Sequence, residues 1–256
     1  MLTVLHLSDT LIAALWGMLR VSGVVMIAPI FGAVFAPARL RILMTAVFAI
    51  VMLPVISSVP EYSPFSLQGF IAVAQEMLIG LSIGFILKLA IESAVFAGQV
   101  ISMGMGLSFA TVVDPQNGGI PLLGRLYIIV ATLLLLTADA HLGLIALLAK
   151  SFELLPVGAG GIGPADARDV VEFASLLFVG AMQLALPSVV AILMVNVAFG
   201  VISRAAPTLN LFAVGLPISM LMGFIVMVLA IRSHGAVWDL QLTKAMTAIG
   251  QLVGGG

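Results

Sequence analysis

Few residues of this chain have side chains and spacings that suit catalysis or metal binding. Its three histidines, His6, His141 and His234, lie far apart in the sequence, and it has no cysteine. There is no His-Glu-x-x-His zinc motif and no nucleophile elbow, which is a Gly-x-Ser-x-Gly turn between a strand and a helix. Asp139 stands two positions from His141, on a different helix face, so we expect a helix-end position rather than a proton-transfer pair. The sequence therefore predicts no catalytic residue, no cofactor and no metal site.

Three ionisable residues, Glu76, Lys88 and Glu92, lie within one long apolar stretch. Lys88 and Glu92 are four positions apart, so on a helix they could pair along one face. Charges at membrane depth are costly, and they are typical of ion or proton pathways. One lysine–glutamate pair is not a relay, however. We therefore favour structural polar contacts, either with partner subunits or at a membrane interface.

The stretch from Gly104 to Gly124 is unusual because it lies between two long apolar segments but does not itself have a helical pattern. It reads GMGLSFATVVDPQNGGIPLLG. Its glycines and prolines disfavour a helix, and Asp-Pro followed by Asn-Gly-Gly favours turns. Irregular backbone of this kind cannot face lipid, because its N–H and C=O groups would lack partners. We expect it to be buried in protein or to line a polar cavity.

The composition indicates a membrane protein. Of the 256 residues, 62% are hydrophobic and only 8% are charged, and the mean hydropathy is +1.28. A typical soluble domain has about 25% charged residues. The formal net charge of -1 argues against nucleic acid as a partner, since that would require a basic surface.

The apolar residues gather into six segments, at 10–31, 42–57, 69–103, 125–149, 173–200 and 211–232. Most approach or exceed the roughly 20 residues that cross a bilayer as a helix. The third is too long for one span, and Pro29, Pro187 and Pro217 should kink or break helices. Basic residues in the connections divide evenly between the two sides and give no orientation. The sequence thus predicts an all-α, multi-helix membrane protein with broken helices, helical hairpins and a short, weakly amphipathic tail after Arg232.

Gly80 and Gly84 form a Gly-x-x-x-Gly pair inside the third segment. Small residues one turn apart let two helices approach closely. The pair is also common by chance in apolar sequences, so a packing role and a chance occurrence are both open.

Five stretches, in order along the chain, resemble the FliR family of flagellar export proteins, which is related to the T component of injectisome export gates. They are APIFGAVFAPARLRI (28–42), QEMLIGLSIGF (75–85), GMGLSFATVVDP (104–115), HLGLIALLAKSFELLPVG (141–158) and the long stretch 185–223. The last contains Arg204, Pro207 and Asn210. Thr208 replaces a usual Gln and Leu216 an expected Phe, and neither departure affects the functional interpretation.

The resemblance implies a fold with a FliP-like part fused to a FliQ-like helical hairpin. One copy would join FliP-type and FliQ-type subunits in a pore-forming gate, which FlhB-type and FlhA-type proteins complete. Such a gate passes unfolded export substrates without being an enzyme. It lies in the flagellar basal body at the bacterial inner membrane, where it contacts lipids and stands largely above the membrane plane.

The resemblance also implies that the loop matching Gly106 to Gly124 plugs the closed channel. Its glycines would let the backbone rearrange, and its bulky apolar residues would block ions. The expected gate-loop residues are Gly104, Gly106, Leu107, Phe109, Asp114, Pro115, Gly118, Gly119 and Leu122. Arg204 and Asn210, beside Pro207, are expected to make structural polar contacts at a helix break. The alternative for the loop is a static buried turn.

Other functions remain as alternatives. The injectisome counterpart shares the architecture, and the Gly-Leu-Ser-Phe-Ala block favours the flagellar protein. A secondary transporter would also use broken helices and buried charges, but the sequence shows no convincing internal repeat. An intramembrane enzyme would need a nucleophile–base motif.

Overall fold

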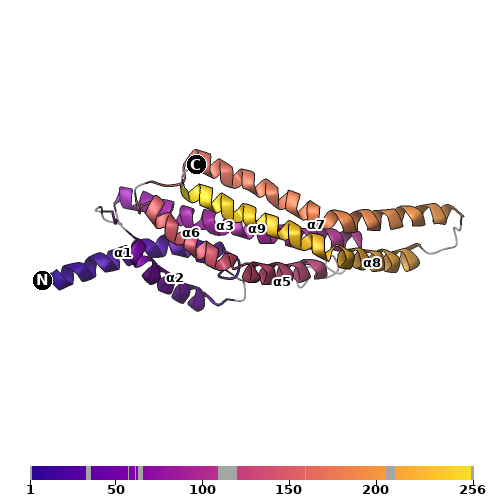
Figure 1. The fold of residues 1–256 in the computed structure, drawn as a ribbon, viewed down its shortest axis with the longest axis horizontal. Coiled ribbons are helices and arrows are strands. Elements are labelled where there is room, and N and C mark those ends of the chain that lie inside the picture. Colours follow the sequence, from indigo (N-terminus) through magenta and orange to yellow (C-terminus); the bar gives the residue numbers. More distant parts are fainter. Residues whose placement is uncertain are drawn as a thin grey trace. The chain divides into compact units, whose positions relative to one another are not determined.

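The computed structural model describes residues 2–32, 36–56, 58–60, 62, 66–108, 120–158, 160–205 and 211–254. Within these ranges all regular structure is helical, which confirms the predicted all-α class. The helices are α1 (Leu2–Ile27), α2 (Ala38–Met52), the 3-10 turn η1 (Leu53–Val55), α3 (Leu67–Gly104), α5 (Leu122–Thr137), α6 (Ala140–Leu154), α7 (Pro164–Ala205), α8 (Leu211–Leu229) and α9 (Ile231–Gly254) (Figure 1).

Two helix boundaries differ from the predicted apolar segments. The segment 125–149 is divided between α5 and α6 at Asp139, which has a left-handed φ of 52° and is the N-cap residue of α6. The helix-end position expected for Asp139 is therefore confirmed. After Arg232 the chain does not form a short tail but continues in the 24-residue helix α9.

The prolines that were predicted to kink or break helices meet this prediction in part. Helices α7 and α8 continue through Pro187 and Pro217, so neither proline breaks its helix. Pro29 lies in the turn that follows α1. Apolar helices tolerate internal prolines where neighbouring groups satisfy the freed backbone carbonyl.

The chain forms two compact units, and each is built from segments that are distant in the sequence. Unit 1 comprises Met1–Leu89, Leu135–Ala174 and Leu242–Gly256. Unit 2 comprises Ala90–Leu134 and Ser175–Gln241. Helices α3, α5, α7 and α9 each contribute residues to both units.

In unit 1, helices α1 and α3 cross at glycines, and α2 packs against α1 (Figure 1). A methyl group on Gly23 would lie 2.7 Å from both the Met77 carbonyl oxygen and the Leu81 nitrogen. A methyl group on Gly84 would lie 3.1 Å from the nitrogen of Ala28. Gly80 faces the backbone of α1 in the same way. The Gly-x-x-x-Gly pair is therefore a packing motif, with Gly23 as its partner on α1.

Residues 80–84 also match the letters Gly-x-Ser-x-Gly. They lie in the middle of the continuous helix α3, with Ser82 half-buried. A nucleophile elbow needs a sharp turn between a strand and a helix to expose its serine. The match therefore carries no catalytic meaning.

In unit 2, polar and aromatic contacts join the helices. Ser219 Oγ of α8 donates to Asn196 Oδ1 of α7 at 2.9 Å. The rings of Phe96 from α3 and Phe178 from α7 meet edge to face, with centroids 5.7 Å apart. The hydroxyl–amide bond satisfies two polar groups between apolar helices, which are expensive to leave unpaired there.

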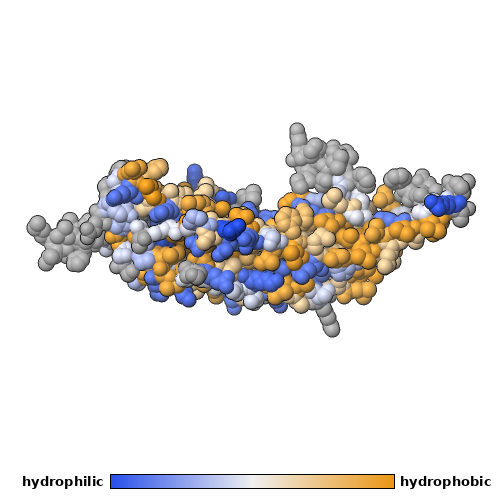
Figure 2. Space-filling model, turned by 90° about the horizontal axis from the view of Figure 1, so that it is seen from above, coloured by the Kyte–Doolittle hydropathy of each residue, from blue (hydrophilic) through white to orange (hydrophobic). Residues whose placement is uncertain are grey.

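Apolar side chains cover much of the visible surface (Figure 2). Among the described residues, four stretches are long and apolar enough to cross a membrane: Thr10–Ile27, Ala38–Val55, Leu67–Gly104 and Pro164–Arg204. The bent pairs α5 with α6 and α8 with α9 raise the number to six if each pair is one span. A water-soluble protein would not expose so much continuous apolar surface.

The glycine crossing in unit 1 leads to a first prediction. Gly23→Ala should destabilise the protein by about 1–3 kcal/mol, because the added methyl group would overlap the backbone of α3. The thermal unfolding midpoint of the purified chain in mild detergent, followed by tryptophan fluorescence, measures this. Gly200→Ala is the control, since a methyl group there meets open space. A Gly23→Ala protein that melts with or above Gly200→Ala would contradict the prediction.

Candidate functional site

Helix α3 ends at the start of the candidate gate loop in a defined motif. Leu107 N donates to the Ser102 carbonyl at 2.9 Å, and Gly106 N donates to the Met103 carbonyl at 3.1 Å. This pair of bonds is a Schellman motif, and Gly106 has its left-handed φ, at 76°. A side chain in that conformation costs about 1–2 kcal/mol. Gly106 therefore determines where α3 ends. This role is separate from the backbone flexibility that the sequence predicted for it.

Met105 fixes the beginning of the loop in the core of unit 2. It is fully buried, whereas Met103 is exposed. The space beside Gly223 of α8 is filled by the Met105 side chain and by Ile192 Cδ1 of α7. Gly104 packs against the same Ile192 side chain. The first turn of the loop is therefore held between α7 and α8.

The other end of the loop is fixed where helix α5 begins. A methyl group on Gly98 of α3 would lie 2.7 Å from the Leu123 carbonyl oxygen and 2.8 Å from the Gly124 nitrogen. The two helices that flank the loop are thus in backbone contact at this crossing. Leu107 is half-buried, and Leu122 is exposed at the start of α5.

Several predicted site residues lie outside the described residues, namely Phe109, Asp114, Pro115, Gly118, Gly119 and Asn210. Arg204 is exposed in the last turn of α7, where a positive charge is favourable because helix carbonyls point toward it. Lys88 is exposed and Glu92 is half-buried, and no ion pair joins them in the described part of α3. The roles assigned to these residues stay predictions.

Glu76 is the predicted polar residue for which the structure shows a complete set of contacts. Its side chain is fully buried in unit 1, and Arg20 Nε of α1 donates to its Oε2 at 2.8 Å. Its other oxygen, Oε1, accepts from the Gly158 nitrogen at 3.2 Å. The charge partner of Glu76 is therefore within the same chain, and both carboxylate oxygens are occupied.

Arg20 also satisfies the carboxyl end of helix α6. Its Nη1 donates to the Ser151 carbonyl at 2.6 Å and to Ser151 Oγ at 3.0 Å. Its Nη2 donates to the Leu155 carbonyl at 2.8 Å. The guanidinium carbon lies 4.4 Å from the centre of the Phe152 ring. The final carbonyls of a helix lack intrahelical partners and carry a partial negative charge, so a buried cation is well placed here.

Arg20 does not appear among the residues that sequence reasoning selected. A signal for it was present, because it is the only charged residue of the apolar segment 10–31. Buried charges in apolar segments usually pair with one another. Arg20 and Glu76, with opposite signs in the first and third apolar segments, could have been matched on that basis.

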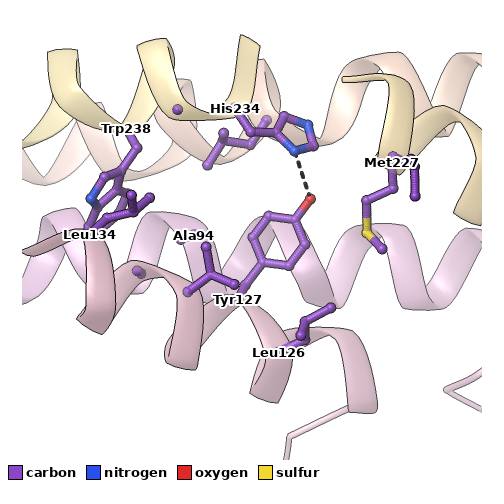
Figure 3. Close-up of a pocket in the computed structure, with 12 residues that line it drawn as sticks. Ala94, Leu126, Tyr127, Leu134, Met227, His234 and Trp238 are labelled. Atoms are coloured by element: carbon purple, nitrogen blue, oxygen red, sulfur yellow. Dashed lines mark hydrogen bonds between the residues drawn. The ribbon is translucent and has the colours of Figure 1, made fainter. Parts of the chain in front are cut away.

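Unit 2 also holds a cavity of about 370 Å³ between α5, α7, α8 and α9, with Ala94 of α3 in its wall. Tyr127 and His234 point toward each other across it, with the hydroxyl 3.4 Å from Nδ1 (Figure 3). Among the described residues, no aspartate, glutamate, lysine or arginine lines the cavity. In the ranges that the structure describes, no group of three or more His, Asp or Glu side chains converges as a metal ligand set.

Comparison with known proteins shows to which family the chain belongs. Residues 11–245 match the family described as bacterial export proteins, family 1. The chain belongs to this family. The match covers α3, both ends of the candidate gate loop and both glycine crossings, so these features lie within the family's domain.

Proteins with similar sequences come from several bacteria. The flagellar biosynthetic protein FliR of Escherichia coli K12 is 36% identical over 215 residues, which are 83% of this chain and 81% of that protein. The protein of the same name from Caulobacter vibrioides is 32% identical over 86% of this chain and 88% of its own length. That of Bacillus subtilis is 30% identical, over 82% of each chain.

The buried ion pair leads to a second prediction. Arg20→Ala should lower the free energy of unfolding by about 3–5 kcal/mol, because it leaves the Glu76 carboxylate buried and unpaired. Thermal unfolding in mild detergent and purified yield report the loss. Arg168→Ala is the matched control, since Arg168 makes only an exposed pair with Glu172, worth about 0–1 kcal/mol. Equal effects of the two substitutions would show that the buried pair contributes no more to stability than the exposed pair.

Proposed function

We propose that this chain is a structural, pore-forming subunit of the flagellar type III protein export gate in the bacterial inner membrane. Its membership of the bacterial export family supports an export role. The relatives described above carry flagellar names, which favours the flagellar gate over its injectisome counterpart. In this role the chain is a conduit component at the flagellar basal body and needs no catalytic group.

The observation that carries this proposal is the length of the apolar surface on α7. Exposed apolar side chains recur along this helix from Val171 to Ile202. At about 1.5 Å per residue that stretch is roughly 46 Å long. The hydrocarbon core of a bilayer is about 30 Å thick, and a usual tilt of about 20° changes this little. Lipid alone does not cover such a helix, so we infer that other protein subunits do.

The subunits that would cover it are FliP-type and FliQ-type proteins, and FlhB-type and FlhA-type proteins would complete the apparatus. Unfolded export substrates would pass through the pore that the subunits enclose. Burial of the helices by these subunits would also explain the even distribution of basic residues. Helices that are packed among subunits above the membrane plane do not cross the bilayer, so the positive-inside rule does not set their orientation.

Within this gate we propose that the loop from Gly104 to Gly124 closes the channel. Its two ends are fixed in unit 2 by Met105 and by the crossing of Gly98 with Gly124. A closing segment needs such fixed ends and an intervening backbone that can change conformation at low cost. Arg204 and Asn210 would hold the far ends of α7 and α8 through polar contacts with neighbouring subunits.

The proposed assembly can be tested by co-purification. The tagged chain, expressed with its own FliP-type and FliQ-type proteins and purified in mild detergent, should give a complex with one copy of the chain by native mass measurement. Leu193→Glu should reduce complex yield at least several-fold, because it places a charge on the exposed apolar surface of α7. Asp169→Lys, an exposed change on the same helix, serves as control. A chain that is stable alone and binds neither partner would contradict the proposal and favour a transporter.

The gating role of the loop has a separate test. Deleting residues 108–119 should leave the complex assembled but make the membrane permeable to ions, because the bulky apolar residues of the loop are removed. Ion flux into vesicles that contain the purified complex measures this. An assembled, ion-tight complex without these residues would show that the loop is a static turn.

A further inference from the structure

Helix α7 exposes a glutamine in the middle of its apolar surface. Gln183 is exposed. Its neighbours on the same face of the helix, Val179, Leu186 and Val190, are 45%, 45% and 41% exposed. In the described part of the chain the Gln183 side chain has no hydrogen-bond partner. Its amide therefore offers one acceptor oxygen and two N–H groups to another molecule.

The backbone at the same point also lacks a donor. Pro187 lies four positions after Gln183 and has no N–H, so the Gln183 carbonyl is without the donor that a regular helix would provide. Pro187 is itself exposed. One turn of α7 therefore presents an amide and a backbone carbonyl together, within a surface that is otherwise apolar.

A second amide of α7 shows how this protein satisfies such a group. Asn196 Oδ1 accepts from Ser219 Oγ of α8 at 2.9 Å, within unit 2. The serine hydroxyl can donate and accept, and it carries no charge. Among the described residues Gln183 has no such side chain opposite it, so we infer that the corresponding group belongs to another molecule.

Neither lipid nor water suits this part of α7. The nearest charged residues of the helix are Glu172, about 16 Å before Gln183, and Arg204, about 31 Å after it. A bilayer core of about 30 Å placed between these charges includes Gln183 or ends beside it. Hydrocarbon cannot hydrogen-bond the amide or the carbonyl, and water would leave the apolar neighbours exposed. An apolar protein helix with one polar side chain satisfies both requirements.

The exposed residues that follow Gln183 have the spacing of a contact between two helices. They recur at alternating intervals of three and four residues, which is the pattern by which one helix packs along another. A methyl group on Gly200, the last of them, would meet open space. This set, called the α7 seam below, consists of Gln183, Leu186, Val190, Leu193, Val197 and Gly200. In such a seam a single polar residue specifies the register of the two helices.

We propose that the α7 seam packs along one apolar helix of a partner subunit, and that a serine, threonine, asparagine or glutamine of that helix hydrogen-bonds Gln183. This inference rests on the export-gate assembly proposed above, because the partner is one of its subunits. The polar contact fixes the register of the two helices, since a slip would leave the Gln183 amide buried and unpaired. The partner side chain is neutral, because α7 has no charged residue between Glu172 and Arg204 to pair with it.

The test is site-specific photocrosslinking of the complex that the tagged chain retains, in dioleoylphosphatidylcholine vesicles. Benzoylphenylalanine is incorporated in place of Val190, which lies about two turns after Gln183. After illumination, crosslinked peptides are mapped by mass spectrometry. We expect links to one apolar helix of a partner subunit. A serine, threonine, asparagine or glutamine should lie about two turns from the linked residue of that helix.

The outcome separates this inference from the proposed assembly. A chain that retains no partner subunit before illumination contradicts both. Three other results overturn this inference alone when partners are retained. They are links from position 190 only to phospholipid, links only to a second copy of the chain, and links to a partner helix that has no such polar residue.

Substitution of Gln183 tests the polar contact itself. Gln183→Leu should spread the links from position 190 over several partner residues and lower the share at the main one several-fold, because apolar packing alone does not fix the register. Gln183→Asn keeps an amide and should retain the main link. Gln251→Leu, the same change at an exposed glutamine of α9, is the control and should leave the links unchanged. An unchanged pattern of links in Gln183→Leu overturns the proposal.

Discussion

The guanidinium of Arg20 is the group on which the arrangement of unit 1 depends. A buried cation is tolerated only when its N–H groups and its charge are both satisfied. Arg20 achieves this with Glu76 from α3, with two carbonyls at the end of α6 and with the Phe152 ring. The three helices must therefore meet in one relative position. Apolar packing alone, being non-directional, would allow them to slide past one another.

The glycines of α1 and α3 make this ion pair geometrically possible. Gly23 lies three positions after Arg20, and Gly80 lies four positions after Glu76, so the close crossing is one turn from the pair. Larger residues would separate the helices and lengthen the Arg20–Glu76 contact. The ion pair also indicates whether Glu76 could take part in proton conduction. Since both oxygens of Glu76 are hydrogen-bonded and the side chain is fully buried, it is a poor candidate for a proton pathway.

Local chemistry made part of this structure predictable from the sequence. The helical class, the stop at Gly106 and the packing of Gly80 follow from composition, turn residues and one-turn spacing. Arg20 was missed because its partner is 56 positions away, and nothing local shows that α1 lies on α3. A helix end at Asp139 was predicted, but 125–149 was still predicted as one segment, because the residues on both sides of Thr137–His141 are apolar.

Helix α9 was underestimated for a different reason. Its many polar residues dilute an apolar stripe that is nevertheless regular, since Trp238, Leu242, Ala245 and Ile249 recur at intervals of three or four and are all buried. That spacing was readable in advance. What it could not reveal is the cavity near Trp238, because a void depends on how five helices meet rather than on any one of them.

The exposed apolar surface sets the chain apart from an ordinary bundle of membrane spans. A helix that crosses a bilayer needs apolar side chains over about 30 Å, and beyond that distance water would favour polar ones. On α7 the apolar residues continue past that limit, and the charged residues lie at its two ends, with Asp166, Arg168, Asp169 and Glu172 at the first and Arg204 at the last. Their distribution is the one expected if protein, not water, meets the helix outside the membrane. A chain built in this way needs other subunits to cover it, and the pore proposed above would supply that cover.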